Sequence, residues 1–210
     1  MVRPSPRNRN RQTEASDPVR AIVVVTAAIA VLATACDQLQ TETVDPALAP
    51  AGWATKSAAF VGVDGAETGR AAFAEAPGGV IIRVDITGLT TGWHGLHIHE
   101  TADCSDGADG FQASGGHVNP DGFIHGLLNE NGAHAADLTN VHAGEDGRAI
   151  AEIFRSGVDL AETEAGASQG HATLLDRDGF ALIVHEGPDD HVAQPIGGAG
   201  ARVACAAVRA

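Results

Sequence analysis

The stretch that decides the fold is residues 94–137, which read HGLHIHETADCSDGADGFQASGGHVNPDGFIHGLLNENGAHAAD. It begins as a strand, in which successive side chains point to opposite faces. His97 and His99 therefore share one face, while Leu96 and Ile98 share the other. Two imidazoles side by side on a rigid strand form half of a preorganised metal site.

After Glu100 the stretch is rich in Gly, Asp, Asn and Ser and has no apolar repeat. A structureless run this long inside a domain is usually functional or disordered. Histidines return within it at intervals among small residues, in GGHVNP (115–120), IHG (124–126) and HAAD (134–137). This pattern favours a loop that a metal orders, with ligands delivered one after another. His134 and Asp137 are three residues apart, close enough in a turn to reach one ion.

The first 35 residues are predicted to be a signal peptide of the lipoprotein type. Five arginines precede residues 21–35, which carry no charge and end at Cys36. Such a run is too short to span a bilayer comfortably and is typical of a signal-peptide core. The ending LATAC (32–36) resembles a bacterial lipobox, although Ala33 stands where a larger aliphatic residue is commoner. Lipidation of Cys36 is therefore expected; the alternative is an ordinary secretory signal with Cys36 uninvolved.

The chain has three cysteines, Cys36, Cys104 and Cys205. Exported proteins tend to pair their cysteines, and an odd one needs a separate explanation. Lipidation of Cys36 leaves Cys104 and Cys205 as a disulfide pair that ties the metal loop to the last strand. The less favoured alternative is two buried free thiols.

Residues 36–53 are polar, with alanines and prolines and no strand pattern, and are predicted to be a flexible tether. Residues 54–210 have the length of one domain. The leader holds five of the 13 basic and two of the 27 acidic residues, so the remainder has a net charge of −17 (8 basic against 25 acidic residues). No nucleic-acid partner is expected for so acidic a chain.

The domain is predicted to be all-β. Short apolar or alternating runs separated by Gly-containing turns read as strands. Besides 92–99, the strand candidates are residues 57–63, 70–75, 80–86, 137–142, 149–154, 180–185 and 201–206. Eight short strands with two long connections, the second over 156–170, predict a Greek-key sandwich or barrel.

Five stretches carry a family resemblance. GLHIHE (95–100), GGHVNP (115–120), HAADL (134–138), ALIVHEGPDD (181–190) and GAGARVAC (198–205) closely resemble the signatures of bacterial copper/zinc superoxide dismutases of the secreted or lipoprotein type, in the same order. The resemblance covers nearly all of the domain. It implies an eight-stranded antiparallel Greek-key barrel, a flattened sandwich with a long metal-binding loop.

The resemblance also assigns the site. Copper would be held by His97, His99, His117 and His185, and zinc by His117, His125, His134 and Asp137. His117 would bridge the two metals as an imidazolate and act as a catalytic residue. Imidazole suits both metals, and three imidazoles with a carboxylate make a closed tetrahedral zinc site. Asp189 would fix ligands of both metals, here His97 and His125. Arg202 would be the catalytic arginine that guides superoxide to copper.

The implied reaction is dismutation of superoxide to oxygen and hydrogen peroxide, which would protect the cell envelope from extracellular superoxide. The expected location is outside the cytoplasm, either anchored to the outer face of the cytoplasmic membrane by the lipid on Cys36 alone or secreted. The chain could be a monomer or a homodimer. Departures from the family pattern are Gly198, where asparagine is common, and His191, where bacterial relatives often have an aromatic residue.

The remaining histidines are not expected to bind metal. His94 matches a structural family histidine, and the residues outside the motifs are read as surface or satisfied groups: His142, His171 and His191. The loop acids Asp103 and Asp106 are expected to face water. Two other functions compete with the enzyme: a non-catalytic copper-binding or metal-buffering envelope domain, and a zinc hydrolase. A non-catalytic copper-binding domain is expected to have lost copper ligands or Arg202, which are all present here. A zinc hydrolase would give no role to a fourth copper histidine.

Overall fold

The structure is a computed structural model that describes residues 48–50, 52–162, 167–168 and 171–210. The expected signal peptide, Cys36 and most of the expected tether lie outside these residues. Within the described part of the chain, no helix is long and apolar enough to cross a membrane.

The described residues form twelve strands and two short 3-10 helices. The strands are β1 (Lys56–Gly62), β2 (Glu67–Ala76), β3 (Gly79–Ile86), β4 (Gly92–His94), β5 (Leu96–His99), β6 (Val141–Ala143), β7 (Ala149–Ser156), β8 (Val158–Glu162), β9 (Ala167–Ser168), β10 (His171–Leu175), β11 (Phe180–His185) and β12 (Arg202–Val208). The 3-10 helices are η1 (Gly107–Asp109) and η2 (Gln112–Ser114).

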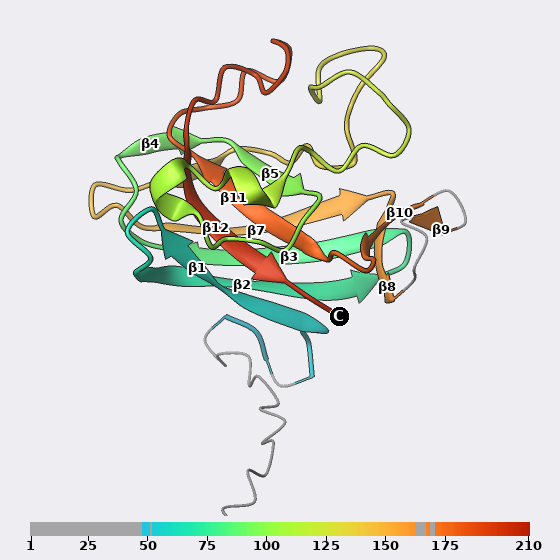
Figure 1. Ribbon diagram of the computed structural model, residues 1–210, viewed down its shortest axis with the longest axis horizontal. Coiled ribbons are helices and arrows are strands. Elements are labelled where there is room, and N and C mark those ends of the chain that lie inside the picture. Colours follow the sequence, from blue (N-terminus) through green and yellow to red (C-terminus); the bar gives the residue numbers. More distant parts are fainter. Residues whose placement is uncertain (1–47, 51, 163–166, 169–170) are drawn as a thin grey trace, which may run out of the picture. The chain divides into compact units, whose positions relative to one another are not determined.

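Seven of the strands form one curled antiparallel sheet in the order β5-β11-β12-β1-β2-β3-β7, and β4 pairs with β6 (Figure 1). A three-stranded sheet, β8-β10-β9, adds a parallel pair between β8 and β10. The predicted all-β, antiparallel barrel-like fold is confirmed.

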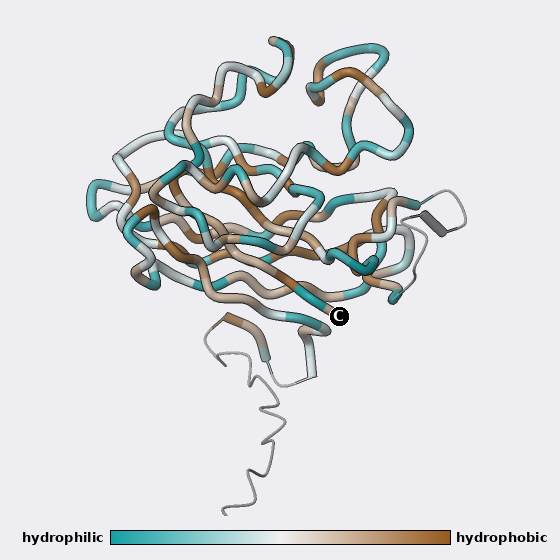
Figure 2. Tube along the Cα trace, viewed as in Figure 1, coloured by the Kyte–Doolittle hydropathy of each residue, from teal (hydrophilic) through white to brown (hydrophobic). Residues whose placement is uncertain are grey.

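The main hydrophobic core draws side chains from most strands of the large sheet and from β6, β8 and β10. On β3 the side chains of Val80, Ile82 and Val84 are buried and alternate with more exposed ones, as strand geometry requires. Phe73 of β2 and Phe180 of β11 pack edge to face with ring centroids 5.1 Å apart, joining distant strands. Figure 2 shows that hydrophobic residues follow the strands and that hydrophilic residues predominate in the loops.

A strand overlaps each of the eight predicted strand regions, with three differences. In the region 137–142 the strand, β6, begins only at Val141, because residues 138–140 lie in the loop. Residues 92–99 are split into β4 and β5 at Gly95, whose N–H donates to the Gly187 carbonyl at 2.8 Å. A Cβ on Gly95 would lie 2.9 Å from that of Ala199, so the close approach of these chains requires glycine. Strands β8, β9 and β10 were not predicted, because all three are short and β8 and β9 fall inside the acidic, Gly-rich gap.

The end of the expected tether packs on the large sheet. Leu48 and Ala49 are buried against Ala72 and Trp53. Arg83 of β3 donates a hydrogen bond to the Leu48 carbonyl at 3.1 Å and lies 4.3 Å from the centre of the Trp53 ring. This segment therefore contacts the domain from Leu48 onward.

Two long loops, residues 100–140 and 186–201, leave opposite ends of the antiparallel β5–β11 pair and project on the same side of the molecule (Figure 1). Hydrogen bonds join them: Gln194 Nε2 donates to the His125 carbonyl at 2.8 Å, and the Leu128 N–H donates to the His191 carbonyl at 3.1 Å. The predicted disulfide is present, joining Cys104 in the first loop to Cys205 of β12 with a Cα–Cα distance of 5.7 Å. Cys205 is fully buried beside Phe111 and Ile183.

Loss of this disulfide should lower stability and metal retention together. Closing a loop of ~100 residues contributes ~4.7 kcal/mol in the chain-entropy model, so Cys205→Ser should lower the melting temperature by on the order of 10 °C. Cys104→Ser and the double variant should match it, because all three lack the same bond. Melting curves and metal analysis under non-reducing conditions provide the measurement. Unchanged values in the single variants would show that the bond contributes nothing.

Candidate metal centre

Two strands and one loop bring together the seven side chains that the sequence assigned to metals. His97 and His99 lie on β5, which pairs with β11 so that His97 is opposite Ile183 near His185. Backbone bridges attach the long loop to this strand, His99 to His117 and His97 to Asp137. The loop thus places its ligands beside those of the sheet, while Leu96 and Ile98 face the core.

The first group consists of four buried imidazole nitrogens that find no hydrogen-bond partner among the described residues: His97 Nδ1, His99 Nε2, His117 Nε2 and His185 Nε2. Ligand atoms of His97, His117 and His185 lie within 4.8 Å of one another, and His99 lies somewhat further out. Unpartnered buried polar atoms are costly and rare in folded proteins. Four of them directed into one region fit a bound metal.

Hydrogen bonds to the opposite ring nitrogens fix the tautomers. His97 Nε2 donates to Asp189 Oδ2 at 2.9 Å, His99 Nδ1 to the Gly115 carbonyl at 2.9 Å, and His185 Nδ1 to the Gly200 carbonyl at 3.0 Å. Each acceptor is an oxygen, so each of these nitrogens carries the proton and the unpartnered nitrogen keeps its lone pair.

Burial keeps these rings neutral. Desolvation lowers the pKa of His97 to about 4, that of His99 to about 2 and that of His185 to about 3. At neutral pH all three imidazoles are therefore neutral, with one protonated nitrogen and one free lone pair, which is the form that a metal binds.

The second group consists of His117, His125, His134 and Asp137. Asp137 Oδ1 is 2.9 Å from His125 Nδ1, 3.2 Å from His117 Nδ1 and 3.6 Å from His134 Nδ1. His117 Nδ1 and His134 Nδ1 are 3.1 Å apart. Four ligands at zinc distances on a tetrahedron are separated by roughly 3.3 Å, so this set has the size of a zinc site.

Proton positions also indicate a cation at this second group. His125 Nε2 donates to Asp189 Oδ1 at 3.1 Å, and His134 Nε2 donates to the Phe123 carbonyl at 3.0 Å. The Nδ1 atoms of His125 and His134 therefore direct lone pairs toward the oxygen of Asp137. Lone pairs at these distances repel one another unless a cation lies between them.

Both carboxylates of the centre are ionised. Burial alone would raise the pKa of Asp137, but hydrogen bonds from His117 and the Gly126 N–H outweigh it and hold the pKa well below its usual range. Burial alone would also raise the pKa of Asp189, but hydrogen bonds from His97 and from the His191 backbone N–H outweigh burial and hold this pKa well below its usual range. Asp189 accepts from one imidazole of each group, so it couples their orientations.

Arg202 lies beside the first group. It pairs with His185 across β11 and β12, and its charge contributes to the low pKa of both His99 and His185. Its Nη1 donates to the Phe111 carbonyl at 2.6 Å and to Ser114 Oγ at 3.1 Å. Burial lowers the pKa of the guanidinium and Asp106 partly offsets this, but arginine remains charged at any pH at which proteins are folded.

Every histidine and carboxylate assigned to the site from the sequence is found in one of these two groups or bonded to it. His94 is structural, with Nδ1 2.7 Å from the His185 carbonyl and Nε2 2.8 Å from the Thr90 carbonyl. His142 is exposed and packs against Trp93, and His171 lies on β10. His191 is closer to the site than expected: its Nδ1 is 3.3 Å from Asp189 Oδ2.

Three supporting residues were missed from the sequence. Arg155 of β7 donates to the carbonyls of Ala135 at 3.0 Å and His134 at 2.8 Å, holding the loop that carries ligands. The sequence held one indication of this role: Arg155 shares a strand face with Ile153 and Ala151, and a charged residue is unusual on the inward face of a strand. Asn140 exchanges two hydrogen bonds with the Asp189 backbone, at 2.8 and 2.9 Å. The third is Ser114, whose Oγ accepts a hydrogen bond from Arg202.

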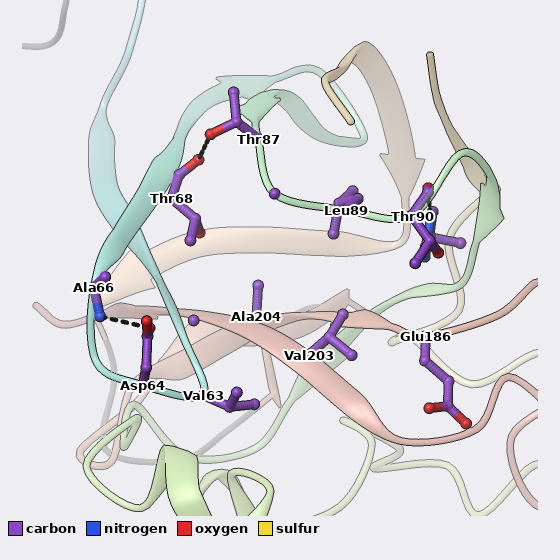
Figure 3. Close-up of a pocket in the computed structure, with 13 residues that line it drawn as sticks. Val63, Asp64, Ala66, Thr68, Thr87, Leu89, Thr90, Glu186, Val203 and Ala204 are labelled. Atoms are coloured by element: carbon purple, nitrogen blue, oxygen red, sulfur yellow. Dashed lines mark hydrogen bonds between the residues drawn. The ribbon is translucent and has the colours of Figure 1, made fainter. Parts of the chain in front are cut away.

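One cavity of the described residues lies outside the two groups. Figure 3 shows this space, about 650 Å³, between Leu89 and the β12 residues Val203 and Ala204. A smaller cavity of about 240 Å³ reaches His117 and is lined also by Glu100 and Thr173.

The fold and the site together define an all-β protein with two adjacent groups of side chains that could each hold a metal ion and that share His117. A family model for copper/zinc superoxide dismutase (SODC) matches residues 67–208, more than half of the chain. The chain belongs to the copper/zinc superoxide dismutase family.

Relatives agree with this placement. A copper/zinc superoxide dismutase of Caulobacter vibrioides is 46% identical over 147 residues, which are 70% of this chain and 80% of that protein. One from Aquifex aeolicus is 34% identical over 153 residues, covering 72% of this chain and 85% of that protein. Among solved structures, a double mutant of an SOD-like protein from Bacillus subtilis has a TM-score of 0.67 at 32% identity, covering 73% of this chain and 97% of that one. The Cu/Zn superoxide dismutase of Brucella abortus has a TM-score of 0.54 at 30% identity, and the match covers 72% of this chain and 97% of that one.

Proposed function

We propose that this chain catalyses the dismutation of superoxide to oxygen and hydrogen peroxide with copper and zinc bound at the two groups. Copper is assigned to His97, His99, His117 and His185, and zinc to His117, His125, His134 and Asp137. The observation that carries the proposal is the position of His117, which has one ring nitrogen in each group. Membership in the family supports the choice of both metals.

Copper, when bound, supplies the one-electron exchange by which one superoxide leaves as oxygen and a second leaves, with two protons, as hydrogen peroxide. The residues of the chain bind, orient and deliver protons. Asp189 holds His97 and His125 in place. His117 can hold a proton at Nε2 while its Nδ1 remains in the zinc group, which makes it a proton carrier at the reacting centre. Arg202 offers positive charge to an anionic substrate beside His185.

Metal analysis of the purified protein alongside a superoxide consumption assay tests this function. The loaded protein should contain copper and zinc and consume superoxide, and His97→Ala should lose copper and activity while His171→Ala keeps both. A fully loaded protein that does not consume superoxide would identify the chain as a non-catalytic copper-binding domain.

We also propose that the enzyme acts at the cell envelope, exported by the leader and anchored through Cys36. The supporting observation is the sequence alone: a basic start, an uncharged run over 21–35 and the LATAC ending. In this arrangement the acyl chains hold the protein to the membrane, with no contact required from the domain.

Removing the lipidation residue tests the anchor. The mature wild-type protein should partition into detergent and carry an acylated N-terminal cysteine. Cys36→Ser should leave the protein unprocessed or release it into the aqueous phase, with the activity of the domain retained. Intact mass of the wild type that shows an unmodified Cys36 would refute the anchor.

A further inference from the structure

Ser114 lies between the arginine and a copper-assigned histidine. It is the last residue of η2 and is fully buried. Its Oγ is 3.1 Å from Arg202 Nη1 and 3.2 Å from His99 Nδ1, and it donates to the Phe111 carbonyl at 2.8 Å. A serine hydroxyl has one proton and two acceptor lone pairs. Here the proton goes to Phe111, so both lone pairs are available to accept from Arg202 and His99.

The proton on His99 Nδ1 agrees with this assignment of donors and acceptors around Ser114. His99 Nδ1–H also donates to the Gly115 carbonyl at 2.9 Å, so the same N–H is shared between two acceptors. Arg202 Nη1 likewise donates to both Ser114 Oγ and the Phe111 carbonyl. Each partner of Ser114 therefore has a second acceptor, and removal of the hydroxyl loosens both without leaving a donor unpaired.

The support beneath Ser114 is rigid. Phe111 is fully buried with Ala181, Ile183 and Cys205, and its backbone takes the left-handed conformation at φ 54°. The Asp106 carboxylate accepts from the Ala113 N–H at 2.9 Å. The disulfide at Cys205 joins this loop to the strand that carries Arg202.

We infer that Ser114 is a positioning residue that sets the guanidinium of Arg202 relative to the copper-binding face of His99. In the part of the chain that the structure describes, Nε and Nη2 of Arg202 have no hydrogen-bond partner. Anchoring Nη1 on Ser114 and Phe111 leaves those groups available to a superoxide anion. The inference rests on the proposed function, because it requires Arg202 to guide the substrate.

A double-mutant cycle between Ser114 and Arg202 separates positioning from general stability. Ser114→Ala should lower kcat/KM by roughly 5-fold, because a charge-assisted hydrogen bond is lost. Metal content and melting temperature should stay close to wild type. In an Arg202→Ala background, Ser114→Ala should have no further effect on kcat/KM. Ser114→Cys, which puts a somewhat larger and weaker acceptor at the same place, should fall between serine and alanine.

Two readouts do not depend on activity. The affinity of the copper(II) protein for azide, a small anion, should fall in Ser114→Ala by a factor similar to the loss in kcat/KM. The copper(II) paramagnetic resonance spectrum should change slightly, since His99 loses one of two hydrogen-bond acceptors. Ser105→Ala is the matched control, because Ser105 is exposed on the same loop, and it should match wild type.

The outcomes distinguish this inference from the function on which it rests. If Arg202→Ala is slow and Ser114→Ala is as fast as wild type, the positioning role is wrong and the proposed function stands. Effects that multiply in the double variant would also overturn it, because Ser114 would then act independently of Arg202. If Arg202→Ala itself keeps wild-type kcat/KM, Arg202 does not guide the substrate, and the positioning role of Ser114 is wrong for that reason.

Discussion

His117→Ala should reduce superoxide consumption by at least about 100-fold and disturb both metals at once. Loss of a residue that only supports a metal ligand typically costs 10–100-fold, and this change removes a ligand from each of two groups. Alanine leaves copper with three imidazoles, and zinc with His125, His134 and Asp137. It also removes the nitrogen that can hold a proton at the reacting centre.

The measurement combines metal content per chain, the copper electronic spectrum and the superoxide assay. His171→Ala removes an imidazole on β10, outside both groups, and should match wild type in all three. In the wild type, removing zinc alone should shift the copper spectrum, because the metals share one ring. A His117→Ala variant with full activity and normal loading would refute the bridge.

The sequence predicted the parts of the site that depend on strand alternation. His97 and His99 share a face because side chains two apart on a strand point the same way, and Leu96 and Ile98 are buried on the other. The choice of loop ligands had a different basis, the resemblance of short motifs. Their convergence could not follow from local pattern, because it depends on hydrogen bonds between segments far apart in the chain.

Long-range contacts also explain what the sequence missed. Arg155 approaches the zinc-assigned loop only because β7 ends the large sheet beside it. His191 replaces a common aromatic residue, yet its ring reaches Asp189 through a turn at φ 61° that no short pattern indicates. Asp106 was expected to face water, but one of its carboxylate oxygens accepts from Ala113 and the other is buried.

The acidity of the chain raises the question of how an anion reaches copper. From Cys36 onward the net charge is −17 (8 basic against 25 acidic residues), which would repel superoxide if it acted as a whole. Two unit charges ~4 Å apart interact by only ~1 kcal/mol in water, and exposed charges beyond ~8 Å are largely screened at physiological salt. Charges close to the metal should therefore dominate, and superoxide dismutase is itself a familiar example of such steering.

Reversing the charge at Arg202 should accordingly have a large effect. Arg202→Ala should lower kcat/KM by roughly 10-fold and Arg202→Glu by more, with unchanged metal content, because no metal-assigned atom is removed. Arg177→Ala is the matched control, since Arg177 is an exposed arginine that contacts only Asp178 among the described residues. Raising ionic strength should slow the wild type, because salt screens the attraction to Arg202, and should slow Arg202→Ala much less. Wild-type activity that rises with salt would mean that the overall acidity governs the approach. An Arg202→Glu variant as fast as wild type would show that the arginine does not guide superoxide at all.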